Sequence, residues 1–352
     1  MPPQTVGKHM VLRDYLGAWL GILGQREQRI VFVDGFAGPG QYEGGEQGSP
    51  LIALDVFEKH SAVGRIIAKP VFLFLEDDLR RHAHLSALVA PIASRLGNRA
   101  DLLVKTGRFD VTMSGLLDNL ESTGSGLAPA FVMVDPFGVS HVPMALMARI
   151  LANKKSEIFV SFMYEAINRH HTTEEFEPHL DDLFGTDQWR QMEAIADPRA
   201  RKQFALNLYE SQLRDAGAEY VTRFELWDEG RFVYAIYFAT GNALGCDRMK
   251  QAIWNADPTG EFQFRAGGDG QMMLLGANLR VLEQQLQGEF SGNEVGIEKL
   301  EAWIQTDATQ FHSGQLKKTL KAMEDTGLLT VTDGTRQRKG TFPAGTRLTI
   351  LP

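Results

Sequence analysis

Cysteine is almost absent from this sequence of 352 residues, in which Cys246 is the only one. A single cysteine excludes a disulfide framework and a zinc site built from cysteines. Long apolar runs are also missing, because none approaches the roughly 20 residues that a membrane helix needs. Residues 1–4 have neither the basic nor the apolar part of a signal peptide. We therefore expect a cytoplasmic protein without a membrane anchor.

An excess of basic residues is lacking too, since 36 lysines and arginines stand against 44 acidic residues and give a formal net charge of −8. This balance excludes a chain coated with basic surface. It leaves nucleic-acid binding open, because phosphate is bound by a local basic patch. The hydrophobic fraction of 43% is ordinary for a globular protein, and the length allows two domains of different size.

The sequence is organised around residues 31–42, where an apolar strand runs into an acidic, glycine-rich turn. Asp34 ends the strand, and the glycines that follow permit positive φ and a close approach of the backbone to a ligand. Pro39 removes an N–H that a pyrophosphate cradle would use. A small zwitterion bound through main-chain atoms fits better and points to S-adenosylmethionine, while an ordinary strand-to-helix turn is the alternative.

Strands alternate with helices over the first 240 residues, which indicates a doubly wound α/β sheet. Further strands begin at Pro70, Asp101, Ala130 and Glu157. A hairpin within 220–239 adds two strands, of which the last is antiparallel. We predict a class I, Rossmann-like methyltransferase sheet of seven strands within residues 1–275, with a helical insertion at about 164–217.

An amphipathic helix is expected in residues 5–25 and should pack on this sheet. Lys8 and His9 precede the apolar positions of the helix. The helix either closes over the cofactor or caps the sheet with solvated charges.

Acidic residues also end the second strand, where a carboxylate of a doubly wound sheet can accept both hydroxyls of a ribose. Glu76 is our choice for this contact and Asp77 the second candidate. The third strand leads into residues 107–109, which we expect beside an adenine ring. The predicted cofactor residues are Asp34, Gly35, Phe36, Ala37, Gly38, Pro39, Gly40, Tyr42, Ser49, Glu76, Asp77, Gly107, Arg108 and Phe109.

The fourth strand ends in the second chemical motif of the sequence, whose members are the predicted catalytic residues Asp135, Pro136, Phe137 and Gly138. The Asp135 carboxylate and the Pro136 carbonyl can accept the two hydrogens of an exocyclic amine, and the aromatic ring can stack on the base. This arrangement would direct the amine lone pair at a methyl donor. The alternative is that Asp-Pro only terminates the strand. We predict no metal site.

Residues 276–352 contain the pattern of a linker helix followed by a helix, a longer helix and a hairpin, which is typical of a winged helix. This fold serves nucleic-acid recognition and protein docking. Basic side chains lie on the longer helix, in the hairpin and after the fifth strand, and they are the nucleic-acid contacts that we predict. These residues are Arg169, Lys317, Lys318, Lys321, Arg336, Arg338 and Lys339. A solvated face is the alternative.

Several motifs together resemble the three-Cys-motif partner proteins (TcmP), and the likeness covers nearly the whole chain. They are residues 34–42, 48–51, 74–76, 134–138, 168–169, 239–240 and 249–250. The resemblance implies a bacterial or phage-linked gene pair and a partner with a three-cysteine, radical-type iron–sulfur motif. The glycine motif and the Asp-Pro pair are also similar to J-type ribosomal RNA adenine-N6 methyltransferases. That similarity implies that Asp135 and Pro136 grip an amine, although Phe137-Gly138 here replaces Pro-Tyr and shifts the aromatic residue by one position.

The sequence therefore predicts an S-adenosylmethionine-dependent methyltransferase that acts on an exocyclic amine of a DNA or RNA base, together with a three-Cys-motif partner. One alternative keeps the fold without catalysis, as a nucleic-acid-binding or partner-docking protein. A weaker alternative is a nuclease that binds a divalent metal through Asp34, Glu76 and Asp135.

Overall fold

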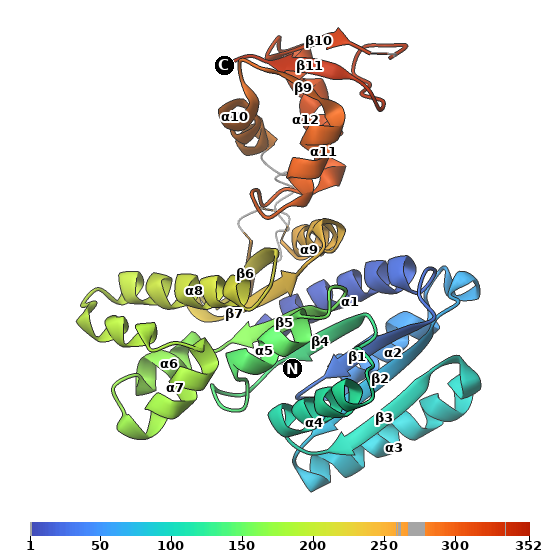
Figure 1. Cartoon of the computed structure of the whole chain (residues 1–352), viewed down its shortest axis with the longest axis vertical. Coiled ribbons are helices and arrows are strands. Elements are labelled where there is room, and N and C mark those ends of the chain that lie inside the picture. The colour runs from blue at the N-terminus through green and yellow to red at the C-terminus, as the bar shows by residue number, and fades with distance from the viewer. Residues whose placement is uncertain (1, 258, 260–261, 267–278, 335) are drawn as a thin grey trace.

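The computed structural model describes residues 2–257, 259, 262–266, 279–334 and 336–352. Its centre is one mostly parallel sheet with helices on both faces (Figure 1). The strands are β1 Arg29–Asp34, β2 Lys69–Glu76, β3 Asp101–Thr106, β4 Ala130–Val134, β5 Glu157–Phe162, β6 Tyr220–Asp228, β7 Arg231–Thr240 and β8 Gln263–Ala266.

The spatial order of the strands is β3-β2-β1-β4-β5-β7-β6-β8. β7 is antiparallel to both of its neighbours, whereas the other neighbouring strands of this sheet pair in parallel. The first seven strands confirm the predicted class I methyltransferase sheet. The predicted strand number is wrong, because β8 adds an eighth strand beside β6. β8 lies in a glycine-rich part of the sequence, residues 257–275, whose composition indicated the end of the first domain and not a further strand.

The helices around the large sheet divide the core into two halves. α1, α2, α3 and α9 pack on one face, where phenylalanines such as Phe32 and Phe131 gather, while α4, α5, α7 and α8 cover aliphatic side chains on the other. None of the helices in the described part of the chain is long and apolar enough to cross a membrane. The helices are α1 Pro3–Leu23, α2 Ser49–Glu58, α3 Leu79–Leu96, α4 Phe109–Ser122, α5 Met144–Leu151, α6 Tyr164–His170, α7 Glu177–Phe184, α8 Pro198–Asp215 and α9 Ala243–Ala256, and the 3₁₀ turns are η1 Val63–Arg65, η2 Gly97–Arg99, η3 Glu174–Phe176 and η4 Gln188–Ala194.

The N-terminal helix contradicts one of the two alternatives given for it. Lys8 and His9 lie inside α1, ahead of its main apolar positions, and they are buried, whereas that alternative left the charges of the helix solvated. Leu12 and Tyr15 follow Lys8 at spacings of four and seven residues and are also buried. Residues at these spacings share one helix face, so Lys8 belongs to the stripe that faces the protein interior.

The remaining elements form a smaller C-terminal domain with its own sheet in the order β10-β11-β9. Its elements are α10 Leu279–Phe290, β9 Glu294–Gly296, α11 Ile297–Gln305, α12 Ser313–Asp325, β10 Leu329–Asp333 and β11 Arg347–Ile350. They include the two helices and the hairpin that the sequence predicted for this region. The predicted boundary at residues 275 and 276, and the start of the predicted linker helix, lie outside the described residues.

α9 holds the C-terminal domain through side chains that are buried and fully engaged. The Lys250 ammonium donates to the carbonyl oxygens of Ile304 at 2.6 Å, Thr306 at 2.5 Å and Thr309 at 3.1 Å. The Asp247 carboxylate accepts from the amide of Ser313 at 2.6 Å and from its hydroxyl at 2.7 Å. A buried charge is tolerated only when it is paired and hydrogen-bonded, so these contacts fix the position of the C-terminal domain.

Glu157, at the start of β5, makes the stability of the fold depend on pH. Its carboxyl group accepts from the Tyr15 hydroxyl at 2.6 Å and the Thr240 hydroxyl at 3.1 Å, and burial raises its pKa from 4.5 to about 7. The folded chain then keeps a proton that the unfolded chain releases above pH 4.5. The contribution of Glu157 to stability is therefore full below that pH and is lost as the pH rises to 7.

Glu157→Gln removes this titration and keeps the hydrogen-bonded shape. We expect its free energy of unfolding to rise, relative to the parent, by up to about 3 kcal/mol between pH 4.5 and pH 7.5. Urea unfolding of both proteins across that range measures the difference. A difference that stays constant with pH would show that Glu157 is not protonated in the folded protein.

Candidate functional site

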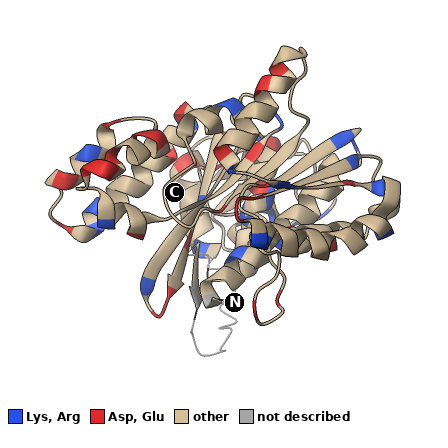
Figure 2. Ribbon diagram, turned by 90° about the horizontal axis from the view of Figure 1, so that it is seen from below, with Lys and Arg blue, Asp and Glu red and all other residues tan. Residues whose placement is uncertain are grey.

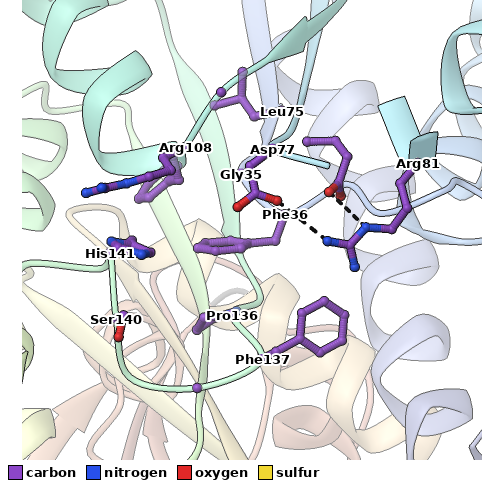
Figure 3. Close-up of a pocket in the computed structure, with 14 residues that line it drawn as sticks. Gly35, Phe36, Leu75, Asp77, Arg81, Arg108, Pro136, Phe137, Ser140 and His141 are labelled. Atoms are coloured by element: carbon purple, nitrogen blue, oxygen red, sulfur yellow. Dashed lines mark ion pairs between the residues drawn. The ribbon is translucent and has the colours of Figure 1, made fainter. Parts of the chain in front are cut away.

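Two adjoining cavities open where the carboxyl ends of β1, β2 and β4 meet, which is the place where doubly wound sheets bind ligands. We call them the β2-side cavity, with a volume of about 240 Å³, and the α1-side cavity, with a volume of about 350 Å³. Both are lined by Phe36, Pro136 and Phe137, so the bend after β1 and the motif after β4 form their common wall. Figure 3 places Phe36 at the centre of the β2-side cavity, with Arg108 on one side and Arg81 on the other.

The predicted cofactor and catalytic residues come together here, with the exception of Asp34. The β2-side cavity is lined by the predicted residues Gly35, Phe36, Glu76, Asp77, Gly107, Arg108, Phe109, Pro136, Phe137 and Gly138, joined by Leu75, Arg81, Ser140 and His141. The α1-side cavity is lined by the predicted residues Phe36, Ala37, Gly38, Pro39, Gly40, Tyr42, Ser49, Asp135, Pro136 and Phe137, joined by Pro2, Gln4, Thr5, Lys8, His9, Gln41, Gly48, Met163, Val233 and Tyr234.

The bend after β1 has a shape that requires glycine. Gly38 and Gly40 have φ values of +60° and +80°, which side-chain-bearing residues rarely adopt. A Cβ atom on Gly40 would lie 2.6 Å from a methyl carbon of Leu85. The bend is closed by the Gly48 amide, which donates to the Gly40 carbonyl oxygen at 2.8 Å. Its backbone therefore reaches the cavity wall without intervening side chains at these positions.

Asp34 lies beneath the bend and does not line either cavity. Its Oδ1 accepts from the Phe36 amide at 3.2 Å, and its Oδ2 is buried without a hydrogen bond to any described residue. Burial raises the pKa of Asp34 to about 6, against the opposing effects of the Ser49 hydroxyl and the Phe36 amide. The contact with a ligand that the sequence predicted for Asp34 is therefore absent from this arrangement, because the side chain turns back to the bend.

Glu76 is the buried carboxylate of the β2-side cavity. Its Oε1 accepts from the Asp78 amide at 2.9 Å and lies 3.0 Å from Nε of Arg81. Burial raises the pKa of Glu76, although the Asp78 amide and Arg81 oppose it. The side chain of neighbouring Asp77 is 61% exposed and lies 3.5 Å from Arg81, as the dashed line in Figure 3 marks. Of the two candidates for a ribose contact, Glu76 therefore has the more desolvated carboxylate.

Arg108 stands at the opposite side of the β2-side cavity. Its guanidinium makes two hydrogen bonds to Asp110, at 3.1 Å and 2.5 Å, and Nδ1 of His141 lies 3.7 Å from the same carboxylate. This bidentate pair orients the guanidinium at the cavity wall. His141 was not predicted, and with a φ of +68° it adopts a backbone conformation that is uncommon for a residue with a side chain.

Asp135 lines the α1-side cavity and is paired with a residue that the sequence analysis did not connect to it. Its Oδ2 accepts a hydrogen bond from the Lys8 ammonium of α1, and its Oδ1 is buried without a partner among the described residues. Burial by itself raises the pKa of Asp135, but Lys8 outweighs burial and holds it below the usual range. Burial likewise lowers the pKa of Lys8, yet Asp135 raises it overall. Both groups are therefore charged at neutral pH.

His9 and Phe137 are two further side chains that line the α1-side cavity. His9 is buried, and burial together with the nearby Lys8 lowers its pKa to about 4, so its imidazole is neutral at pH 7. Phe137 is 86% exposed at the boundary of the two cavities, and the Arg81 guanidinium lies 5.9 Å from its ring centroid. An exposed aromatic ring beside an arginine is a surface on which a planar group can stack.

Sequence reasoning missed Lys8, His9, Arg81, His141 and Tyr234 as members of the site. For Lys8 a signal existed, because a charged residue four positions before Leu12 lies on the apolar stripe of the helix. A charge on a buried face needs a partner, and this requirement points to an acid elsewhere in the fold. The other four carry no comparable mark in the sequence.

The basic residues predicted to contact nucleic acid lie outside both cavities. Ion pairs join Lys317 to Glu301 at 3.1 Å, Arg336 to Glu324 at 2.5 Å and Lys339 to Asp325 at 3.2 Å. Figure 2 shows acidic and basic residues interspersed over the helices that flank the sheet. The charge of the predicted basic patch is therefore partly compensated within the protein.

The metal-dependent nuclease hypothesis requires several metal-ligating side chains that lie close together. Among the described residues, no group of three or more histidines, cysteines or acids lies close enough together to hold a metal ion. Asp34, Glu76 and Asp135 end neighbouring strands, but the first lies beneath the bend, the second faces Arg81 and the third pairs with Lys8. The nuclease hypothesis is therefore not supported by the arrangement of these acids.

No family model matches this sequence, and no curated protein matches it. The solved structures similar to it include a methyltransferase domain of METTL16, with 14% sequence identity and a TM-score of 0.32 over 66% of this chain and 65% of that one. This chain thus covers less than two thirds of the METTL16 domain. An O-methyltransferase from Bacillus cereus in complex with SAH matches with 11% identity and a TM-score of 0.33 over 65% and 80% of the two chains. The O-methyltransferase TomG from Streptomyces achromogenes in complex with SAM matches with 10% identity and a TM-score of 0.34 over 65% and 79%.

Proposed function

We propose that this protein is an S-adenosylmethionine-dependent methyltransferase that acts on an exocyclic amine of a nucleic-acid base. The fold alone does not establish an activity, so the proposal depends on the site. One observation carries it. The glycine bend and the Asp135-Pro136-Phe137 segment, about a hundred residues apart in the sequence, line one cavity, and the buried carboxylate of Glu76 lines the adjoining one.

The residues present fit the methyl donor. Glu76 would accept hydrogen bonds from the ribose hydroxyls, and residues 107–109 would lie along the base. The backbone of Gly38 and Gly40, which lines the α1-side cavity, would contact the amino-acid end. Bound S-adenosylmethionine supplies a methyl group on a sulfonium, which leaves as a neutral thioether when an amine nitrogen takes the methyl group.

The residues around Asp135 fit the acceptor. The Asp135 carboxylate and the Pro136 carbonyl can accept the amine hydrogens, and Phe137 can stack on the ring that bears the amine. Holding the amine in this way directs its lone pair and stabilises the positive charge that it gains as the new N–C bond forms. After transfer, the amine loses one proton. Alignment supplies most of the rate, and the base must be unpaired or flipped to enter the cavity.

The test measures the donor and the acceptor separately. Calorimetry with S-adenosylmethionine and S-adenosylhomocysteine measures donor binding, and transfer of a tritiated methyl group to RNA, DNA and protein fractions of a cell extract identifies the acceptor. We expect donor binding and label in an N-methylated base after digestion to nucleosides. Donor binding with label only in protein would overturn the acceptor class. No donor binding would overturn the enzyme.

Phe137→Ala is expected to weaken acceptor binding about fivefold or more, because stacking of a base on an aromatic side chain contributes roughly 1–3 kcal/mol. The side chain is exposed, so the free energy of unfolding should stay within about 0.5 kcal/mol of the parent. The KM for the labelled nucleic-acid fraction measures the effect. Val111→Ala is the matched control, since Val111 is another exposed apolar residue and lines neither cavity. Equal KM values for all three proteins would argue against a stacked base.

A second candidate function is a partner-docking protein without catalysis, and one observation favours it. The carboxylate that should grip the amine is already occupied by Lys8. The donor-binding measurement separates the two candidates, because a docking protein has no need of S-adenosylmethionine.

For either candidate function we also propose, from the resemblance to TcmP proteins, that the C-terminal domain is a winged helix and that a three-Cys-motif protein is the partner. Co-purification of the two proteins from cells that express both tests this.

A further inference from the structure

Lys8 lies in the α1-side cavity at the position where an acceptor amine would have to bind. Its ammonium donates a hydrogen bond to Oδ2 of Asp135, and the other oxygen of this carboxylate is buried. An amine that approaches through the cavity therefore meets Lys8 at the accessible carboxylate oxygen. We infer that Lys8 determines which acceptors are used, by requiring an anionic group close to the amine. The acceptor class is then a base within a nucleotide or polynucleotide, and this inference rests on the proposed function.

The surroundings of Lys8 explain why its displacement requires an anion. The Lys8 side chain is only 6% exposed, and a buried ammonium without a counterion is strongly disfavoured. The groups near it are the Tyr234 ring, whose centroid lies 5.8 Å away, the neutral His9 and the Tyr42 hydroxyl. The remaining nearby carboxylate, Asp34, is shielded beneath the glycine bend. When an acceptor amine replaces Lys8 at the Asp135 carboxylate, a phosphate on the same acceptor molecule can become the new counterion of the Lys8 ammonium.

The same arrangement disfavours other amines. A lysine side chain of a protein substrate would bring a second ammonium next to Lys8, and two like charges in a poorly solvated site repel strongly. A free nucleoside has a neutral amine but no anion, so it would leave Lys8 unpaired. Only an acceptor with both an uncharged amine and a phosphate replaces both halves of the Lys8–Asp135 pair.

The test uses binding, so that it does not depend on turnover. The full chain is saturated with S-adenosylhomocysteine, and calorimetry compares 5′-monophosphates with the nucleosides of adenine, cytosine and guanine, and with a short single-stranded RNA. For at least one base we expect the monophosphate to bind roughly tenfold or more tightly than the nucleoside, as one charge-assisted contact predicts. We expect Nα-acetyl-lysine amide, which keeps its side-chain ammonium, not to bind.

Lys8→Met should bring the ratio of the two affinities to within about twofold of unity, with the nucleoside bound more tightly and the monophosphate less tightly than in the parent. Lys8→Arg should retain most of the preference. Lys154→Met is the matched control, because Lys154 is exposed and lines neither cavity. Unchanged binding of S-adenosylhomocysteine shows that the variants are folded.

The remaining outcomes would contradict either the role of Lys8 or the proposed function. An unchanged preference in Lys8→Met, or no binding of any nucleotide or RNA to the protein saturated with S-adenosylhomocysteine, would overturn the role of Lys8 and leave the donor site standing. Tighter binding of Nα-acetyl-lysine amide than of any nucleotide would also overturn it. A parent protein that does not bind S-adenosylhomocysteine would overturn the proposed function itself.

Discussion

Glu76→Ala should weaken the binding of S-adenosylmethionine by about 100-fold or more. The expected reason is the loss of two hydrogen bonds from ribose hydroxyls to a carboxylate, each of which contributes roughly 1.5–3 kcal/mol. The side chain of Glu76 is desolvated in the wall of the β2-side cavity, so water cannot replace these contacts well. Calorimetry with the donor measures the change directly and needs no knowledge of the acceptor.

Asp77→Ala is the matched control for this variant, because Asp77 is the next residue, lines the same cavity and also lies near Arg81. Its carboxylate is largely solvated, so we expect donor affinity within about threefold of the parent. Glu76 also contacts the start of α3, and thermal unfolding must therefore show that both variants are folded. Equal losses of affinity in the two variants would contradict the ribose contact of Glu76.

Asp135→Asn is expected to lower methyl transfer by about 100-fold to 1,000-fold while the affinity for S-adenosylmethionine changes little. An amide accepts hydrogen bonds through one oxygen only and does not stabilise the positive charge that grows on the amine. A loss of one charge-assisted contact and of alignment corresponds to roughly 3–4 kcal/mol. Single-turnover transfer to the labelled nucleic-acid fraction measures the rate, and calorimetry measures donor binding.

The Lys8–Asp135 pair complicates this variant, because removal of one partner from a buried ion pair costs about 3–5 kcal/mol of stability. The double variant Lys8→Met/Asp135→Asn removes both charges and should recover most of that stability. It should not recover methyl transfer. A double variant that transfers methyl groups at the parent rate would show that Asp135 serves only to neutralise Lys8.

The sequence was sufficient to predict most of the large sheet. Parallel strands covered on both faces appear as apolar runs, and Val31–Val33 and Ala130–Val134 are such runs that lie in β1 and β4. The carboxyl ends of neighbouring parallel strands share one edge of a sheet, so the glycine bend and the Asp135 motif could be expected at a common cavity. The hairpin of β6 and β7 was equally readable, because a short polar stretch around residues 228–231 separates two runs rich in β-branched and aromatic residues.

What the sequence did not reveal depends on contacts between distant residues. Lys8 and Asp135 are 127 positions apart, and nothing local selects one acid of the chain as the partner of Lys8. The direction of the Asp34 side chain depends on the hydrogen bond to Phe36, and either direction suits the sequence. β8 was missed because a strand of four residues at a sheet edge has too little periodicity to stand out from a glycine-rich region.

The attachment of the C-terminal domain has a consequence for how this chain can be divided. Trp254 of α9 packs on Phe311, with ring centroids 5.3 Å apart, and its indole N–H donates to the Gln310 carbonyl oxygen at 2.8 Å. Buried side chains from α9, α10, α11 and α12 belong to one continuous hydrophobic core. Truncation before α10 would expose the Trp254 indole to solvent and remove the three carbonyl oxygens that accept hydrogen bonds from Lys250. The two domains therefore depend on each other, and we expect the first domain, expressed without the second, to be less stable than the full chain.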